Sequence, residues 1–495
     1  MKESKPAIAG EPDPIGVSRR AFLRRAGMTA GGVAAVSGTT LATLAAHTVW
    51  ATEGHGRSQD HRGRERCSHY GALSPVADQN GAHILALPRD FRYVTFSKIG
   101  DPMSDGFLVP RNHDGMQVFD GPGRTLRLIR NHELRNAAGN FALGVEVPAA
   151  LRYDQKGMGG CTIVDFDPEH KRVVREFAGI GGTFVNCAGG LSFKSAGWIT
   201  CEETTAGVAQ GFEKPHGYNF LVPASARSAV PAVPLKAMGR FAHEASVADE
   251  RGIVYQTEDS GNNSGFYRFL PNRREHLAAG GVLQMLAVTG QPTATLFTGQ
   301  TVGVRLPVEW VTINDPDPDL EGGALSCFRQ GRALGGAAFN RLEGVFCGLD
   351  GRSIYFVSTS GGAAFGQLWH YIPAGNGEGD QLVLVFQSPR GSVLDSPDNI
   401  CITPSGAILM DEDDASGDND THALAPGITD VNRLIGIGLA GEPFEFAVNI
   451  LNDSEFAGSC FSPDGEILFV NLFGNGALGS GMTCAIWGPW ERGPL

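Results

Sequence analysis

Several motifs of chemically active proteins are missing from this 495-residue sequence. None of its nine cysteines forms a CxxC pair, and histidines and cysteines do not gather at the close spacing of a structural zinc site. There is no P-loop and no GxSxG context, so neither a nucleotide-binding loop nor a serine nucleophile is indicated. Amphipathic helical patterns are also scarce, which disfavours an α/β fold.

The composition is acidic and rich in glycine. Asp and Glu number 53 against 40 Lys and Arg, which gives a formal net charge of −13. A chain this acidic lacks the basic stripe that nucleic acids require, so no nucleic-acid partner is expected. The 68 glycines are about twice the usual share, which is typical of many tight turns between short strands. The composition therefore favours an all-β fold.

The N-terminus predicts export. Residues 18–24, SRRAFLR, form a twin-arginine motif, and a weakly apolar run over 26–46 follows it. That run is too weakly hydrophobic to predict a stable membrane span. We interpret residues 1–51 as a twin-arginine signal peptide, 52–84 as a flexible lead-in and 85–495 as one catalytic domain. The twin-arginine translocase is then a partner, the location is periplasmic or secreted, and we expect a monomer.

A short pattern recurs along the mature chain. A turn with Gly or Pro beside Asp or Ser leads into a β-branched or aromatic strand that ends on polar or acidic residues. Six such strands are predicted, at 126–130, 198–201, 253–257, 354–357, 407–410 and 467–470. This repetition predicts a six-bladed β-propeller with loop and short helical insertions and with polar strand ends at one mouth. A pair of β-sandwiches would give similar turn signals and is the alternative.

The stretch 181–203, GGTFVNCAGGLSFKSAGWITCEE, carries the most specific chemistry. Cys187 lies in a turn flanked by glycines, and the next strand ends on Glu202 and Glu203. A thiolate and two carboxylates brought together suit a metal ion. Each residue alone could equally be a buried cysteine or a solvated glutamate. The recurrence of acidic strand ends favours the metal hypothesis.

A second constellation joins a cation to a carboxylate. Arg341 and Glu343 are two residues apart, so on an extended segment their side chains face the same side. This spacing suits Glu343 on a metal and Arg341 on an anion held by that metal, because a guanidinium matches two phosphate or carboxylate oxygens. A plain ion pair on a strand is the alternative. Oxygen-rich ligands suit calcium, and a thiolate among carboxylates tolerates iron.

Several segments in order resemble the PhoX-type alkaline phosphatase family: NHDGM at 112–116, RNHE at 130–133, NCAGG at 186–190, TCEE at 200–203, FAHEA at 241–245 and RLEG at 341–344. The resemblance implies a six-bladed propeller whose mouth holds ferric and calcium ions and hydrolyses phosphate esters. It also implies that Cys187 ligates iron and that Arg341 grips the phosphate. The chain departs from the family at 192–198, where SFKSAGW replaces a TPWGTW-type run, and this bears on substrate specificity. The catalytic candidates are Arg341 and Asn186, and the metal-ligand candidates are Cys187, Glu202, Glu203, Glu244, Glu258, Asp259, Glu343, Asp411 and Asp413.

Three functions are compatible with these residues. The leading hypothesis is hydrolysis of small phosphate monoesters assisted by Fe(3+) and Ca(2+). A calcium-dependent lactonase or esterase would use His243 as a base and has no role for Cys187. A non-catalytic exported propeller would use calcium only to hold its loops.

Overall fold

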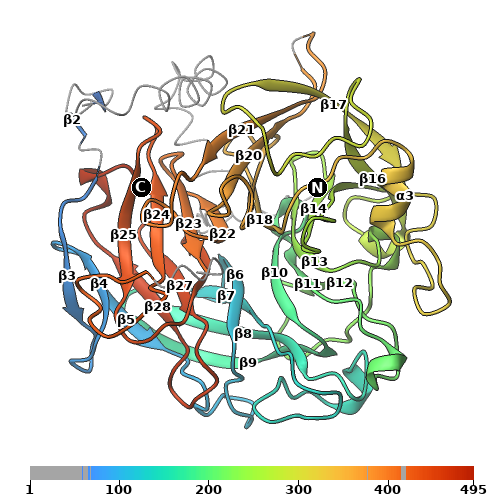
Figure 1. Ribbon diagram of the computed structural model, residues 1–495. Coiled ribbons are helices and arrows are strands. Elements are labelled where there is room, and N and C mark those ends of the chain that lie inside the picture. Colours follow the sequence, from blue (N-terminus) through green and yellow to red (C-terminus); the bar gives the residue numbers. More distant parts are fainter. Residues whose placement is uncertain (1–57, 60–64, 67–68, 376, 414–419) are drawn as a thin grey trace, which may run out of the picture.

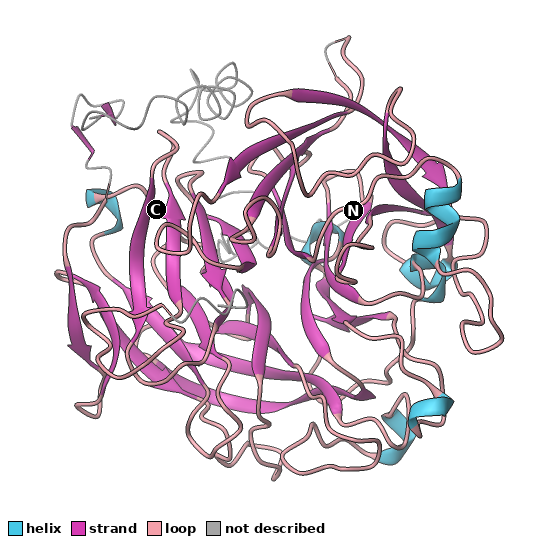
Figure 2. Cartoon of the chain, in the orientation of Figure 1, coloured by secondary structure: helices cyan, strands magenta, loops and turns pink. Residues whose placement is uncertain are grey.

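The computed structural model describes residues 58–59, 65–66, 69–375, 377–413 and 420–495, and the predicted signal peptide lies outside this part. Within it, strands surround a common centre (Figure 1), and most of the few helical segments lie toward the outside of the molecule (Figure 2). No helix among the described residues is long and apolar enough to cross a membrane. The expected all-β class is confirmed. The helical segments are α3 (Cys327–Ala333) and the 3-10 turns η1 (Ala149–Leu151), η2 (Phe193–Ser195), η3 (Val208–Gln210), η4 (Lys236–Met238), η5 (Leu277–Ala279) and η6 (Trp490–Arg492).

The described strands form antiparallel sheets that follow one another along the chain. A four-stranded sheet contains β6 (His113–Asp120), β7 (Leu126–His132), β8 (Gly159–Asp167) and β9 (Arg172–Thr183), and a three-stranded sheet contains β10 (Asn186–Leu191), β11 (Gly197–Glu202) and β12 (Asn219–Pro223). A nine-stranded sheet contains β13 (His243–Ala248), β14 (Val254–Glu258), β15 (Phe266–Pro271), β16 (Gly281–Val288), β17 (Arg305–Thr312), β18 (Leu342–Cys347), β19 (Ile354–Ser358), β20 (Gln367–Ile372) and β21 (Gln381–Gln387).

The remaining sheets combine strands from both ends of the chain. A six-stranded sheet contains β22 (Pro397–Ile402), β23 (Ile408–Glu412), β24 (Arg433–Ile437), β25 (Pro443–Asn449), β4 (His83–Pro88) and β3 (Leu73–Ala77). A four-stranded sheet contains β26 (Phe456–Phe461), β27 (Leu468–Leu472), β28 (Met482–Trp487) and β5 (Arg92–Phe96). A separate ribbon pairs β1 (Ser58–Gln59) with β2 (Glu65–Arg66).

The nine-stranded sheet is made of two meanders joined by one long strand. β13 to β16 form the first meander and β18 to β21 the second. β17 pairs with β16, where Gln284 is opposite Thr312, and with β21, where Arg305 is opposite Val383. This strand therefore continues the hydrogen-bonding ladder from one meander to the next.

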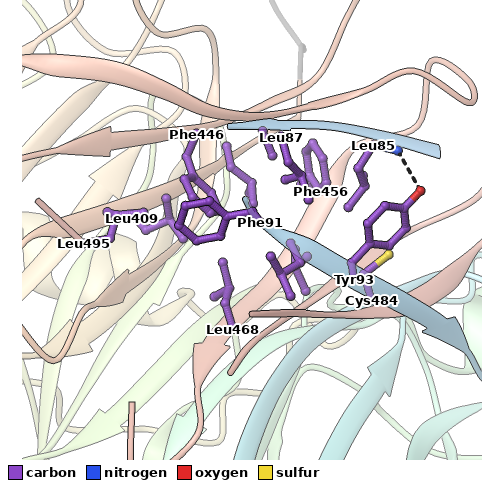
Figure 3. Close-up of a cluster of buried hydrophobic side chains, with 14 of the residues drawn as sticks. Leu85, Leu87, Phe91, Tyr93, Leu409, Phe446, Phe456, Leu468, Cys484 and Leu495 are labelled. Carbon is purple, nitrogen blue, oxygen red and sulfur yellow. Dashed lines mark hydrogen bonds between the residues drawn. The ribbon is translucent and has the colours of Figure 1, made fainter. Parts of the chain in front are cut away.

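N-terminal strands complete the C-terminal sheets. β5 pairs with β28, with Phe96 opposite Thr483, and β4 pairs with β25. Apolar side chains from both ends pack into one buried cluster (Figure 3), in which the Leu85 amide donates to the Tyr93 hydroxyl at 3.3 Å. Each such side chain contributes about 1.5–3 kcal/mol on burial. These pairings cover the outer edges of β28 and β25 and tie the two ends of the chain together. They also place β3 within the stretch expected to be a lead-in.

The sheets contain six consecutive units, β6–β9, β10–β12, β13–β16, β18–β21, β22–β25 and β26–β28. The first strand of each unit lies at the centre. β6, β10, β13, β18, β22 and β26 contact one another in a closed ring, and five of them are labelled around the middle of Figure 1. Small residues allow these strands to approach closely. A Cβ on Gly115 would lie 2.5 Å from the Ala188 Cα, and one on Gly344 would lie 2.7 Å from the Asp398 carbonyl oxygen. Glycine is therefore required at these contacts.

The six strands predicted from the turn pattern correspond to β7, β11, β14, β19, β23 and β27. Each is the second strand of its unit and lies next to the innermost strand. The polar ends of these second strands consequently lie beside the first residues of the central ring.

Candidate metal centre

The central strands share one position that faces the middle of the molecule. In five of them the second residue is acidic or a cysteine: Asp114, Cys187, Glu244, Glu343 and Asp398. The pairing register shifts around this residue in every case, so that two residues oppose one on the neighbouring strand. Such β-bulges re-aim a side chain and are frequent beside functional sites.

A second set of acidic residues comes from the ends of the neighbouring strands. Glu133, Glu203, Asp259 and Asp413 directly follow β7, β11, β14 and β23, and Glu455 directly precedes β26. Because these strand ends meet the beginnings of the central strands, residues distant in sequence are brought to one mouth.

Nine of these residues form one continuous cluster. Their ligand atoms fall into four groups, within each of which all atoms lie within 4.8 Å of one another. Neighbouring groups share a member, so the cluster continues from a thiol through eight carboxyl groups. The groups are Asp114, Glu133 and Cys187; Cys187, Glu203 and Glu244; Glu244, Glu343 and Asp398; and Asp398, Asp413 and Glu455.

Burial and mutual repulsion dominate the electrostatics of this cluster. Desolvation, followed by the charge of Asp398, raises the pKa of Glu244 well above its usual value. Desolvation, followed by the charge of Asp114, raises the pKa of the Cys187 thiol. The pKa of Glu203 is raised to about 7, mainly by desolvation. Without added positive charge, ionisation of these groups is costly.

The donor atoms of this cluster fit metal cations. Both carboxylate oxygens of Glu244 are buried and have no hydrogen-bond partner among the described residues. Two of the four groups offer only hard oxygen ligands, and the two that contain Cys187 add a soft sulfur ligand. Bound cations would supply the charge that the buried carboxylates lack.

Two arginines flank the cluster from separate strand ends. The Arg135 guanidinium pairs with both Glu133 and Glu203, and its side chain is 59% exposed. Arg341 approaches Asp259 Oδ2 through Nε at 3.1 Å and Glu343 Oε1 through Nη2 at 3.1 Å, and its side chain is 30% exposed. Both guanidinium groups therefore reach from the acidic cluster toward solvent.

The Arg341–Glu343 contact arises differently from the expected extended segment. Arg341 has φ +41°, and β18 begins only at Leu342. The two side chains meet because the chain turns sharply before the strand. Arg135 was not among the predicted site residues. It lies two residues after Glu133, beyond the end of β7, where no motif indicated it.

Strained turns of this kind precede four central strands. Non-glycine residues with positive φ stand directly before β6, β10, β18 and β22; for Val185, a β-branched residue, φ is +51°. Such conformations cost of order 1–3 kcal/mol and persist where the surroundings enforce them. The positions are Asn112, Val185, Arg341 and Ser396.

The last residue of each adjacent second strand holds the corresponding turn in place. Its side chain bonds the backbone one residue before the strained position, at Arg111, Phe184, Asn340 or Asp395. The Phe184 amide donates to Glu202 Oε1 at 2.9 Å, and the Asp395 amide donates to Glu412 Oε1 at 2.8 Å. The His132 and Ser358 side chains instead contact carbonyl oxygens, those of Arg111 and Asn340. These side chains hold the backbone that carries the cluster residues.

Of the predicted metal ligands, Cys187, Glu203, Glu244, Glu343 and Asp413 are brought together in the cluster. Asp259 lies at its edge, paired with Arg341. The Glu202 carboxylate instead accepts hydrogen bonds from the backbone of Phe184, Gly217 and Tyr218 and contacts His216. Glu202 therefore stabilises the turn before Cys187.

Three further candidates lie outside the four groups. Glu258 accepts from the Tyr267 hydroxyl at 2.6 Å and from the Gly265 amide. Asp411 accepts from the Ser459 amide at 2.9 Å and is completely buried. Asn186 accepts from Thr183 Oγ1 at 2.6 Å and donates to Thr200 Oγ1 at 2.9 Å. The contacts of Asn186 place it within the turn beside Cys187.

Four cluster residues were missed by sequence reasoning: Asp114, Glu133, Asp398 and Glu455. Asp114 and Glu133 belong to the NHDGM and RNHE segments, so these segments could have been used to predict them. Asp398 shares a weaker signal with Asp114, Glu244 and Glu343, an acidic residue followed by Gly, Ala or Asn near the start of a strand. Glu455 precedes β26 and has no such signal.

Comparison with known proteins agrees with this geometry. The sequence pattern of the family described as "Alkaline phosphatase PhoX" matches residues 68–476. Pseudomonas fluorescens PhoX in complex with vanadate, a transition-state analogue, has a similar fold, with a TM-score of 0.60 and 16% identity over 86% of this chain and 99% of that chain. No curated protein matches.

Two gluconolactonases are more distant. XC5397 from Xanthomonas campestris has a TM-score of 0.39 and 10% identity over 88% of this chain and 100% of that chain. The periplasmic gluconolactonase PpgL from Pseudomonas aeruginosa has a TM-score of 0.33 and 14% identity over 77% of this chain and 86% of that chain. Likenesses this weak carry no functional weight.

An all-β, propeller-like fold around an acidic cluster with one thiol defines the class of a β-protein with a candidate metal centre. The chain belongs to the alkaline phosphatase PhoX family and is a metal-dependent phosphoric ester hydrolase, as the resemblance implied.

Proposed function

We propose that this protein hydrolyses small phosphate monoesters at a mixed iron and calcium centre in the mouth of a six-bladed propeller. The observation that carries the proposal is the cluster itself, in which one thiol and eight carboxyl groups converge beneath two partly exposed guanidinium groups. The nine-stranded sheet counts as two blades in this description, divided at β17. The ring of six central strands supports that division.

We infer the ions from the donor chemistry. The two groups that contain Cys187 suit Fe(3+), and the two groups of carboxylates alone suit Ca(2+). When bound, these cations supply Lewis acidity toward the phosphate and its leaving group. Glu244 belongs to one group of each kind and offers two oxygens without hydrogen-bond partners, so it would be a ligand in either group.

The protein's own groups position the substrate. Arg341 and Arg135 present planar guanidinium groups beside different carboxylates of the cluster, and such groups bind phosphate oxygens in pairs. Both are already oriented by carboxylates, which reduces the rotamer entropy lost on binding. Negative charge on the phosphate group is redistributed during hydrolysis, and fixed positive charge beside it stabilises the transition state. The Cys187 thiol lies within the ligand cluster and is not needed as a nucleophile.

Asn186 and Glu202 act on the turn that carries Cys187. Asn186 bonds the side chains of Thr183 and Thr200, and Glu202 bonds the Phe184 amide. We assign both a positioning role. His243, which a lactonase would need as a base, is fully buried, contacts the Gly239 carbonyl through Nε2 and stacks on Phe241. This environment favours the phosphatase over the lactonase.

We further propose that residues 1–51 direct export through the twin-arginine pathway and that the mature protein acts as a periplasmic or secreted monomer. The SRRAFLR motif at 18–24 supports the route. Residues 85–495 would form the catalytic propeller, and β3 extends it toward the N-terminus.

The test is metal analysis combined with turnover. Protein purified without chelator should contain iron and calcium and release phosphate from an aryl phosphate, and a chelator should abolish that release. Glu244→Gln should lose metal and activity together, whereas Glu250→Gln, away from the cluster, should lose neither. Full metal content without turnover of any phosphate ester would instead support the non-catalytic calcium-binding propeller.

A further inference from the structure

A basic cavity lies at the opposite end of the molecule from the acidic cluster. It has a volume of about 440 Å³ and is lined by Phe193, Lys194, Arg273, Arg274, Glu275 and His276. These residues belong to the segments after β10 and β15. β10 carries Cys187 at its beginning, so the segment after its end is about 15–20 Å away, the length of a six-residue strand. The cavity is therefore separate from the catalytic centre.

Positive charge in this cavity exceeds what its own acid neutralises. Lys194 Nζ lies 2.7 Å from Glu275 Oε1. Lys194 is the main cause of the lowered pKa of Glu275, with smaller contributions from His276 and Arg273. Among the described residues, the guanidinium groups of Arg273 and Arg274 form no hydrogen bond or ion pair with any side chain or backbone group. The lining of the cavity thus contains one acid, Glu275, against the three cations Lys194, Arg273 and Arg274.

The stem of one of these arginines, Arg274, is packed against a neighbouring turn. A Cβ on Gly252, where φ is +82°, would lie 2.8 Å from the Arg274 Cβ and Cγ, so the stem of Arg274 packs directly on that glycine. Arg274 also lines a neighbouring cavity of about 280 Å³ with Arg251 and Leu270. The Arg251 guanidinium is already paired with Asp249 at 2.7 Å. Arg274 therefore borders both cavities, and its charge is added to that of Arg273 and Lys194 in the first.

The remaining wall is aromatic. The Lys194 ammonium lies 5.0 Å from the Phe193 ring centroid, and Phe193 is half-buried. Both residues belong to the SFKSAGW segment at 192–198, the point at which the sequence departs from the family pattern. The cavity volume is in the range of small-molecule sites. An aromatic face beside arginines suits an anion that carries an apolar group.

We propose that this cavity is a second binding site for a phosphate-bearing ligand, distinct from the hydrolytic centre. Arg273 and Arg274 bind the phosphate oxygens, and Phe193 packs against the organic group. The protein as a whole is acidic, with a net charge of −13, so this cavity attracts anions only at short distances, where its own positive charge dominates. The ligand chemistry is shared by a soluble organic phosphate and a phospholipid headgroup.

The test compares the double variant Arg273→Gln/Arg274→Gln with the matched variant Arg89→Gln/Arg305→Gln, which removes two exposed arginines elsewhere. The probe is phenylphosphonate, which is not a phosphate ester and offers both a phosphonate and a ring. Calorimetry on the metal-loaded enzyme should give two molecules bound per chain for the native protein and for the matched variant, and one for the cavity variant. Aryl phosphate turnover should be unchanged in both variants.

A second arm identifies the source of the ligand. Co-sedimentation uses vesicles of phosphatidylglycerol with phosphatidylcholine against vesicles of phosphatidylcholine alone. A loss of at least about tenfold in binding to the anionic vesicles, in the cavity variant only, would assign the site to a lipid headgroup. A loss of phenylphosphonate binding without vesicle binding would assign it to a soluble phosphate. Identical behaviour of both variants with both probes would overturn the proposal.

Discussion

Glu202 Oε1 lies 2.7 Å from Nδ1 of His216, and neither side chain has any exposure to solvent. The next residue, Glu203, faces the acidic cluster. Desolvation alone would lower the pKa of His216, but the charge of Glu202 and the contact with Asp154 raise it to about 9. His216 is therefore a buried cation at neutral pH, and it holds the carboxylate that fixes the turn before Cys187.

His216→Asn should destabilise the protein by about 3 kcal/mol at pH 6, because it leaves Glu202 and Asp154 buried without their cation. His216 binds its proton more tightly in the folded state, so its contribution is fully present below the unfolded pKa of about 6.5 and is lost as pH rises through about 9. Urea unfolding of both proteins at pH 6 and pH 9 measures this. The difference in free energy of unfolding between the native protein and His216→Asn should be much smaller at pH 9 than at pH 6. The same difference at both pH values would show that His216 is not charged in the folded protein.

Cys187→Ser tests the thiol as an iron ligand. Serine conserves the shape of the side chain but removes the thiolate, so the thiolate-to-iron absorption band should disappear and kcat should fall by at least about 100-fold. The matched control is Cys327→Ser, because Cys327 is equally buried but lies in α3. The control should keep both band and activity. A band that survives in Cys187→Ser would assign iron to other ligands.

Metal removal should make stability depend on pH. Burial raises the pKa of Glu203 to about 7, from an ordinary value of 4.5. A carboxylate with a raised folded pKa keeps its proton in the folded state after the unfolded state has lost it, so the free energy of unfolding falls as pH rises from about 4.5 through about 7. Bound cations stabilise the ionised form and oppose this fall.

The measurement is the thermal midpoint of chelator-treated protein between pH 5 and pH 8, with and without restored iron and calcium. The metal-free midpoint should fall over this range, and the metal-loaded midpoint should fall much less. A metal-free protein as stable at pH 8 as at pH 5 would show that the cluster carboxylates are not forced together.

Sequence reasoning found the second strands but not the register that orients their ends. The second strands were visible because Gly, Pro and Asp turns precede them. Four of them, β7, β11, β14 and β23, end on a titratable doublet such as Glu202 and Glu203, and alternation along a strand sends the two side chains to different surroundings. In each doublet of this kind the first residue binds within the blade and the second faces the centre, as Glu412 bonds Arg433 while Asp413 joins the cluster.

The central strands were harder to predict. Segments such as NCAGGL and PDNICI are short and contain glycine, proline or asparagine, which are depleted in ordinary strands. They form strands here because ring contacts override local propensity. The bulge that points Asp398 inward depends on pairing with β23, which no local pattern encodes. Asp398 was missed for this reason, whereas Glu455 lies just before β26, outside any strand.

Arg135 provides the last prediction, because its exposed guanidinium joins Glu133 and Glu203 across two groups of the cluster. If it binds phosphate with Arg341, Arg135→Gln should weaken inhibition by inorganic phosphate about tenfold and lower kcat/KM by about 10- to 100-fold. Arg135→Lys keeps the charge without the planar fork and should recover only part of this loss.

The control for Arg135 is its effect on the metals. Arg135 also neutralises two carboxylates, so its removal leaves more negative charge for cations and should not reduce iron or calcium content. Metal analysis of Arg135→Gln therefore separates the two roles. A variant that keeps its metals but binds phosphate more weakly supports direct contact with the substrate. Loss of iron together with activity would show instead that Arg135 holds Glu133 and Glu203 in place for the metal.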